Sequence, residues 1–207
     1  MGFTYAACYQ ISKFAAQSLF DLRVYGQDNI IEEGPALLAM NHQSFLDPPF
    51  AGISCRREIF YLARKTLFDI PVLGWILRRI NLIGVDRDGS DVTALKAVMR
   101  VLKSGCCTIV FPEGTRSPDG ALQPAKPGAG FIIAKTLAPV IPMRIFGAHE
   151  AFPKGAKFPR PSPVTIVVGE PMRFSKADIA GDPRIVFQRL SERVMEKIAA
   201  LKNPREG

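Results

Sequence analysis

The fold of this chain is decided by residues 82–111, which read LIGVDRDGSDVTALKAVMRVLKSGCCTIVF. Two short aliphatic runs, Leu82–Val85 and Thr108–Phe111, are typical of buried strands. Between them, Ser90 can cap a helix that Gly105 ends. The apolar side of that helix carries Val92, Leu95, Val98, Met99 and Leu102. A strand, a helix and a second strand in this order predict an α/β sheet with helices on its faces.

The same pattern continues on both sides of this unit. Further buried strands are expected at Ala36–Met40, Ile59–Ala63, Val140–Ile145 and Val164–Val168. Pro142, inside one of them, suggests an edge position or a bulge. A last helix is expected from Pro183 to Leu201, with Asp182 as its N-cap and Val186, Leu190, Val194 and Ile198 as its apolar stripe. Since no repeat or linker interrupts the chain, we predict a single α/β domain whose mixed β-sheet is flanked by helices.

Composition narrows the partners of this domain. The 207 residues carry 27 Lys and Arg against 19 Asp and Glu, a net charge of +8, which favours an anionic partner such as nucleic acid, a membrane surface or a phosphorylated substrate. The four cysteines form no C-x-x-C pair, which indicates a reducing environment. Neither histidine, His42 or His149, has the spacing of a zinc ligand, and nucleotide-binding glycine fingerprints are lacking, so we expect no metal and no cofactor.

The N-terminal segment Phe3–Phe20 is apolar but too often interrupted to be a strong membrane-spanning candidate. At helical spacing, one face carries Ile11, Phe14, Ala15, Leu19 and Leu22, and the opposite face carries Gln10, Lys13, Gln17 and Asp21. Such an amphipathic helix either docks on the core or lies on a membrane. The segment Phe68–Ile80, apolar nearly all round, is either a buried helix or an interfacial surface. The proline- and glycine-rich stretch Phe152–Pro163 is interpreted as a basic surface loop.

A first polar motif, Asn41-His42-Gln43-Ser44-Phe45-Leu46-Asp47, follows the strand Ala36–Met40 directly. His42 and Asp47 can meet across the turn into a helix, where the carboxylate would fix the imidazole and leave its second nitrogen as a general base. The alternative is a capping box formed by Ser44 and Asp47, with His42 a satisfied strand-end side chain.

A second polar motif, Phe111-Pro112-Glu113-Gly114-Thr115-Arg116-Ser117, follows another strand. Gly114 permits close backbone approach, Arg116 offers a planar fork suited to phosphate, and Thr115 and Ser117 add hydroxyls. The alternative is an ordinary turn with a solvated pair of Glu113 and Arg116. Arg87, after a third strand, can reach the same crevice or belong to a capping turn.

These motifs, with Arg87 and the strand Val140–Met143, resemble the four ordered motif blocks of the glycerolipid acyltransferases, most closely the 1-acylglycerol-3-phosphate (lysophosphatidic acid) acyltransferases. The resemblance covers residues 20–175 and divides the chain into an N-terminal amphipathic helix, 1–25, and an acyltransferase domain, 26–207. It implies that His42 is the catalytic base and Asp47 its orienting partner. It also implies that Arg87, Glu113, Gly114 and Arg116 belong to the site of the phosphate-bearing acceptor, with Glu113 orienting Arg116 or a hydroxyl, and that Pro142 belongs to the acyl-donor block. The hydroxyl of Thr115 is expected to add a contact to the same acceptor.

The expected activity is transfer of a fatty acyl group from acyl-CoA or acyl carrier protein to lysophosphatidate, forming phosphatidate at the cytoplasmic face of a membrane, with peripheral or monotopic attachment. Another lyso-lipid acceptor, or a non-catalytic module that binds anionic membranes, are the alternatives. A serine esterase is disfavoured because the chain has no G-x-S-x-G elbow. Nucleic-acid binding is disfavoured because the basic residues are scattered among apolar segments.

Overall fold

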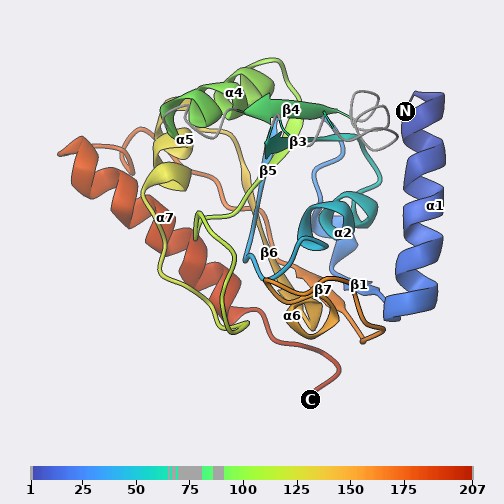
Figure 1. Ribbon diagram of the computed structural model, residues 1–207. Coiled ribbons are helices and arrows are strands. Elements are labelled where there is room, and N and C mark those ends of the chain that lie inside the picture. The colour runs from blue at the N-terminus through green and yellow to red at the C-terminus, as the bar shows by residue number, and fades with distance from the viewer. Residues whose placement is uncertain (1, 65, 67–68, 70–80, 86–90, 207) are drawn as a thin grey trace.

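A computed structural model of the chain describes residues 2–64, 66, 69, 81–85 and 91–206 (Figure 1). Within these residues the strands form one sheet, in the order β1-β7-β6-β2-β5-β3-β4. Their bounds are β1 Arg23–Tyr25, β2 Ala36–Met40, β3 Ile59–Arg64, β4 Leu82–Val85, β5 Cys107–Val110, β6 Val140–Phe146 and β7 Thr165–Val168. Neighbouring strands are parallel except β6 and β7, which confirms the predicted mixed sheet.

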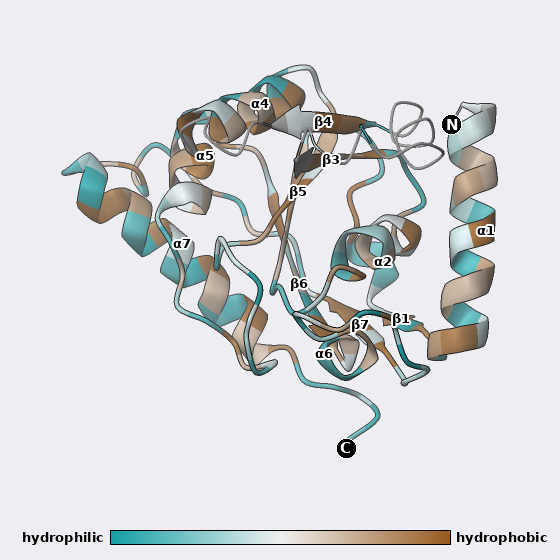
Figure 2. Cartoon of the chain, viewed as in Figure 1, coloured by the Kyte–Doolittle hydropathy of each residue, from teal (hydrophilic) through white to brown (hydrophobic). Residues whose placement is uncertain are grey.

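Helices cover both faces of this sheet. Their bounds are α1 Phe3–Phe20, α2 Asp47–Ser54, α4 Asp91–Lys103, α5 Gly128–Thr136, α6 Ala148–Ala151 and α7 Pro183–Ala200, with a 3-10 turn η1 at Gln27–Asn29. Figure 1 shows α1 and α2 on one side of the sheet and α4, α5 and α7 on the other. Figure 2 shows hydrophobic strands between helices of mixed hydropathy, as this layered arrangement requires.

Strand β2 lies at the centre of the sheet, between β5 and β6, and all five of its residues are fully buried. Ala36, Leu38 and Met40 pack in the core cluster that includes α1 and α2. Leu37 and Ala39 pack in the opposite cluster with α4, α5 and α7. A strand covered on both faces has no polar side to show, so the run ALLAM is uninterrupted by polar residues.

The two long helices on the α7 side match their predictions. Helix α7 begins at Pro183 and is capped by Asp182, whose carboxylate accepts a hydrogen bond from the backbone N–H of Arg184. Helix α4 ends at Lys103, close to the predicted stop at Gly105. The proposed cap Ser90 and most of the segment Phe68–Ile80 lie outside the described residues.

Helix α5 and strand β1 are among the elements that were not predicted from the sequence. Helix α5 begins at Gly128, in a stretch rich in glycine. Gly130 is required by packing, because a Cβ there would lie 1.9 Å from the backbone oxygen of Phe187 in α7. Strand β1 has only three residues and exists through parallel pairing with β7. In both cases a tertiary neighbour overrides a weak local preference.

The edge position suggested for Pro142 is wrong, since β6 lies between β2 and β7. Its partners are Ala39 in β2 and the backbone N–H of Gly169, which donates to the Pro142 oxygen. Val140 pairs with Met172 and Met143 with Val168, so three steps along β6 face four steps along the opposing segment. The extra residue of the opposing segment forms a β-bulge, which is the other possibility that Pro142 suggested. A bulge disrupts the ladder locally and therefore accommodates a residue without an N–H.

Helix α1 docks on the core by one face and exposes apolar side chains on another. Tyr5, Ala16 and Phe20 are buried, and the Tyr9 hydroxyl donates to the Ile53 carbonyl of α2. The predicted apolar face is largely exposed: Ile11 70%, Phe14 73% and Leu19 54%, while Leu22 is buried. Among the described residues, no helix combines the length and the hydropathy needed to cross a bilayer.

Candidate active site

The candidate site begins where β2 ends. Asn41, the first residue after the strand, is buried and exchanges two hydrogen bonds with the backbone of Ile145 in β6: its amide nitrogen donates to the carbonyl (3.1 Å) and its oxygen accepts from the N–H (2.8 Å). This side chain extends the β2–β6 ladder by one step. The strand end that carries His42 is therefore held firmly in the sheet.

His42 and Asp47 form the predicted pair. The His42 Nδ1 lies 2.7 Å from the Asp47 Oδ2, and Asp47 is fully buried while the histidine side chain is 18% exposed. Because a carboxylate accepts hydrogen bonds, the proton of the neutral imidazole sits on Nδ1 and Nε2 carries a lone pair. This is the arrangement that a general base requires.

Half of the capping-box alternative is present as well: Asp47 accepts the Ser44 N–H, but the N-cap of α2 is Leu46 and, among the described residues, no side chain caps the helix. The Asp47 Oδ2 also accepts from the backbone N–H groups of Gln43 (2.6 Å) and Ser44 (2.7 Å), and the Ser44 hydroxyl accepts from the N–H of Leu46 (3.2 Å). One carboxylate thus fixes both the loop and the imidazole. The two interpretations are compatible, because the short turn into α2 brings the His42 imidazole and the N–H groups of Gln43 and Ser44 to one oxygen of Asp47.

The second motif lies directly against the first. The Phe111 ring stacks on the His42 imidazole at 3.9 Å, and the Ser117 N–H donates to the His42 carbonyl at 2.7 Å. The His42 N–H in turn donates to the Glu113 Oε1 at 3.3 Å. Because β2 and β5 are adjacent and parallel, their carboxyl ends meet and the two polar motifs form one site.

Glu113 is a buried carboxyl in this site, with 1% of its surface exposed. Burial and, to a smaller extent, the nearby Asp47 charge raise the pKa of Glu113, the hydrogen bond from the His42 N–H lowers it, and the resulting pKa is about 7. Within the described residues, its second oxygen, Oε2, has no hydrogen-bond partner. A buried, readily protonated carboxyl does not repel an anionic acceptor as a surface carboxylate would.

Gly114, Thr115 and Arg116 line the outer part of the second motif. Gly114 has a φ of 67°, which favours glycine, and both Gly114 and Thr115 are exposed. The Arg116 guanidinium lies 3.5 Å from the ring centre of Phe45, on the His42–Asp47 loop. A guanidinium can stack on an aromatic ring through its face and form hydrogen bonds through its edge.

Two predicted residues remain, Arg87 and Pro142. Arg87 is outside the described residues. Pro142 is buried in β6 opposite Ala39, within the sheet, and its role in binding an acyl donor stays a prediction. The described part of the chain contains no group of histidine, cysteine or acidic side chains suited to a metal ion.

Three polar contributions to the site were not singled out from the sequence. Asn41 is described above. Gln43 donates from its amide to the Gly120 carbonyl (2.6 Å), and the Ser44 hydroxyl donates to the Phe152 carbonyl (2.9 Å). Each bond joins the His42 loop to a segment distant in sequence, so local spacing carries no signal for them. Their position inside a seven-residue polar motif was the available clue.

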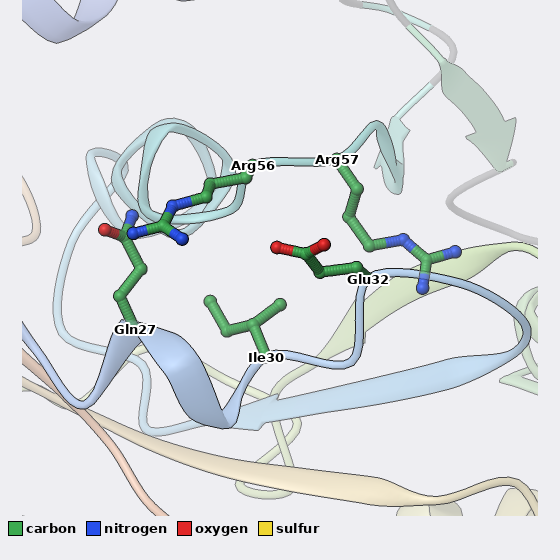
Figure 3. A pocket seen from close by; sticks show the side chains of 5 residues that line it. All are labelled: Gln27, Ile30, Glu32, Arg56 and Arg57. Atoms are coloured by element: carbon green, nitrogen blue, oxygen red, sulfur yellow. The ribbon is translucent and has the colours of Figure 1, made fainter.

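Two cavities differ in whether they have room for part of a lipid substrate. One has a volume of about 10 Å³, enough for no more than a water molecule, and Figure 3 shows its lining, Gln27, Ile30, Glu32, Arg56 and Arg57. The other is an open groove of about 320 Å³ between residues 122–125 and α7. Gln123, on its rim, donates to the Ser117 hydroxyl at 3.4 Å. The groove therefore lies beside the second motif and has room for an alkyl chain.

Comparisons with known proteins point in the same direction. A chloroplastic 1-acyl-sn-glycerol-3-phosphate acyltransferase of Brassica napus is 34% identical over 163 residues, covering 77% of this chain and 47% of the relative. The 1-acyl-sn-glycerol-3-phosphate acyltransferase of Bacillus subtilis is 27% identical over 184 residues, 88% of each chain. The crystal structure of the 1-acyl-sn-glycerophosphate (LPA) acyltransferase of Thermotoga maritima is 30% identical, with a TM-score of 0.73 over 96% of this chain and 81% of that one.

The chain spans about half the length of the plant relatives it matches. The acyltransferase family model matches residues 21–146, a range that includes β2, the His42–Asp47 pair, the Glu113–Arg116 motif and all of β6. With the family model, the solved relative and the geometry of the two motifs in agreement, this chain belongs to the acyltransferase family.

Proposed function

We propose that this protein transfers a fatty acyl group from a thioester donor, acyl-CoA or acyl carrier protein, to the free hydroxyl of lysophosphatidate, forming phosphatidate. The observation that carries the proposal is the buried Asp47 carboxylate 2.7 Å from the His42 Nδ1, with Arg116 stacked on the same loop. A base and a phosphate-binding cation on one rim suit a phosphate-bearing alcohol. The names of the relatives support the choice of acceptor.

In the proposed reaction, the acceptor hydroxyl gives its proton to the His42 Nε2 while its oxygen attacks the thioester carbonyl. The buried Asp47 stabilises the resulting imidazolium and holds the ring in place. The C–S bond then breaks, and the departing thiolate takes the proton from His42. The new ester is phosphatidate, the free thiol is the second product, and no acyl-enzyme is formed.

We further propose that the protein works while bound peripherally to the cytoplasmic face of a membrane, where lysophosphatidate resides. Support comes from the exposed Ile11, Phe14 and Leu19 of α1 and from the net charge of +8. Apolar side chains enter the headgroup boundary while basic residues are attracted to anionic lipids.

The test is to supply the purified chain with a panel of thioester donors and lyso-lipid acceptors and to identify the products by mass spectrometry. We expect phosphatidate from lysophosphatidate, and the preferred donor then distinguishes acyl-CoA from acyl carrier protein. A product only from other lyso-lipids would change the acceptor. A chain that binds lysophosphatidate and thioesters but forms no ester would leave the non-catalytic alternative.

The first prediction concerns the catalytic pair. His42→Ala is expected to lower turnover about 10²- to 10⁴-fold with the fold retained, because the reaction loses its base. Asp47→Asn keeps one oxygen for the loop N–H groups of Gln43 and Ser44 but removes the charge, so its turnover should fall with little loss of stability. Turnover and thermal unfolding are measured together. Near-normal turnover of His42→Ala would refute the assignment of the base.

A further inference from the structure

We propose that the loop of residues 152–163, FPKGAKFPRPSP, is a second lipid-binding element, separate from α1, that places the mouth of the active site against an anionic membrane surface. The loop carries three basic residues and no acidic one. Phe158, at its centre, is 78% exposed, the highest exposure among the large apolar side chains of the described residues. The inference rests on the proposed function for its biological meaning, but not for its test.

The loop holds Phe158 outward by its own backbone. The Arg160 N–H donates to the Ala151 carbonyl at 2.7 Å and the Ala156 N–H to the Pro153 carbonyl at 3.1 Å, so the base of the loop is closed. Its four prolines restrict the backbone further. Because the loop is stiff, less conformational entropy is lost when the exposed phenylalanine ring enters a membrane. The basic side chains Lys154, Lys157 and Arg160 are exposed around it.

The same loop touches the candidate active site. The Phe152 carbonyl accepts a hydrogen bond from the Ser44 hydroxyl (2.9 Å), and the Phe152 ring lies 6.0 Å from the Phe45 ring. Phe45 is itself 61% exposed and carries the Arg116 guanidinium on its face. These contacts connect the His42–Asp47 loop to Phe152, the first residue of the loop that carries Phe158.

The loop and helix α1 meet at one end of the molecule. The N–H of Val164, the residue after the loop, donates to the carbonyl of Phe20, the last residue of α1, at 2.8 Å. Figure 1 shows the segment between α6 and β7 at the same end as the C-terminal end of α1. The two elements can therefore contact one surface together.

An anionic lipid surface fits this loop better than an acidic protein does. Charge complementarity alone suits both, but a protein interface would need a pocket for Phe158, whereas a bilayer accepts a protruding ring anywhere on its surface. Each basic residue near an anionic membrane contributes additional attraction. The partner that we expect for this loop is therefore a bilayer that contains anionic phospholipid.

The test uses flotation of the whole chain with phosphatidylcholine vesicles that contain increasing phosphatidylglycerol. Phe158→Ser is expected to weaken binding about tenfold at every lipid composition, since the loss is apolar. Changing Lys154, Lys157 and Arg160 together to Gln is expected to remove the dependence on phosphatidylglycerol and to leave the binding that survives high salt.

Matched controls separate this loop from general charge and hydrophobicity. Ile185→Ser removes another highly exposed apolar side chain, on α7. Changing Lys96, Arg100 and Lys103 together to Gln removes the same charge from exposed positions of α4. Both controls should bind vesicles nearly as the unmodified chain does. All variants should turn over a short-chain lysophosphatidate dissolved as monomers at the unmodified rate, whereas the loop variants should be slow with lysophosphatidate embedded in vesicles.

Loop variants that bind vesicles as tightly as the unmodified chain, or no more weakly than the two controls, would overturn the inference. Unchanged vesicle binding with lost binding of acyl carrier protein would also overturn it and assign the loop to an acidic protein. If the unmodified chain formed no product from any donor, the proposed function would fail. Vesicle binding that still depended on Phe158 would nevertheless support the lipid-binding loop.

Discussion

The Asp47 carboxylate binds both the His42 imidazole and the backbone of the loop that carries it. Its Oδ2 receives the Nδ1–H of His42 and two backbone N–H groups of the same loop. A buried carboxylate is costly unless it is paired and hydrogen-bonded; these donors compensate Oδ2, whereas Oδ1 has no hydrogen-bond partner among the described residues. The imidazole is consequently fixed by the same interactions that stabilise the turn, so geometry and catalysis depend on one side chain.

The second prediction concerns phosphate recognition. Arg116→Ala and Arg87→Ala are each expected to lower kcat/KM for lysophosphatidate about ten- to hundredfold, the effect of losing a charge-assisted bond. Arg116→Lys should restore little, because an ammonium replaces neither the bidentate fork nor the stacking on Phe45.

The control for these arginine variants is an acceptor without phosphate, such as a monoacylglycerol. Its weaker reaction should be nearly unaffected by the substitutions. An equal loss with both acceptors would show that the arginines support the fold, not the phosphate.

The third prediction uses Glu113. Its pKa is raised by burial from an ordinary 4.5 to about 7, so the folded chain holds this proton more tightly than the unfolded chain. The free energy of unfolding should therefore fall as the pH rises from about 4.5 to about 7, by at most about 3 kcal/mol. Glu113→Gln, which stays neutral, should not show this contribution.

The measurement is urea unfolding of the unmodified chain and of Glu113→Gln at several pH values between about 5 and 8. The difference between the two chains should move in favour of the glutamine variant as the pH rises. Two curves that stay parallel over this range would show that Glu113 is ionised at low pH in the folded chain.

At the scale of elements, the contact of α5 with α7 supports the α4/α5/α7 face of the sheet. The Gly130 N–H, in the first turn of α5, donates to the buried Ser191 hydroxyl of α7 at 2.8 Å. First-turn N–H groups have no partner within their own helix, so a side chain of the neighbouring helix serves as a cap. The absence of a side chain at Gly130 allows this approach.

The fourth prediction tests that approach. Gly130→Ala should lower the free energy of unfolding by about 1–3 kcal/mol or more, because the new Cβ would lie 1.9 Å from the Phe187 oxygen. Gly128→Ala is the matched control, since its Cβ would meet only the end of the Leu95 side chain at 3.4 Å. The control should be neutral or stabilise the helix by up to about 1 kcal/mol. Equal effects of the two substitutions in denaturant unfolding would exclude a backbone clash.

At the scale of the whole molecule, the exposed side of α1 is expected to bind membranes. The fifth prediction is that changing Phe14 and Leu19 together to Gln lowers the flotation of the chain with vesicles at high salt, where electrostatic attraction is screened to about 3 Å. Binding of the unmodified chain should rise with the fraction of anionic lipid. At 1 M salt, where the Debye length is about 3 Å, its binding should fall only partly.

The control for α1 keeps the apolar character, with Phe14→Leu and Leu19→Ile combined, and should bind as the unmodified chain does. The buried side chains Tyr5, Ala16 and Phe20 remain untouched in both variants, so docking of α1 is preserved. Membrane binding that high salt abolishes completely would point to electrostatics alone and remove the role of the apolar face.

Much of this protein follows from local sequence. Strands β2 and β4 have the predicted bounds, β3, β6 and β7 differ by one residue at one end, and β5 is shifted by one residue at both ends. Runs buried on both faces must be apolar throughout, so they are visible without a structure. The His42–Asp47 pair is also local, since five positions of one turn separate the two residues and the turn closes on itself.

Other features needed the tertiary structure. The exposed face of α1 contains three of the five apolar residues predicted to share one side, Ile11, Phe14 and Leu19. Apolar residues lie on more than one side of this helix, so only its neighbours decide which of them are buried. Helix α5 has glycines that disfavour a helix but permit contact with α7.

The features of the candidate site can be separated in the same way, into those that follow from the sequence and those that need the fold. The sequence determined that a histidine, an aspartate and a Glu-Gly-Thr-Arg motif follow buried strands. Only the fold decided that Phe111 stacks on His42, that Glu113 is buried beneath the His42 N–H, and that the Phe152 loop joins the rim. The physical reason is range: strand burial and short turns depend on near neighbours, whereas these contacts join segments that meet only through the pairing of β2 with β5 and β6.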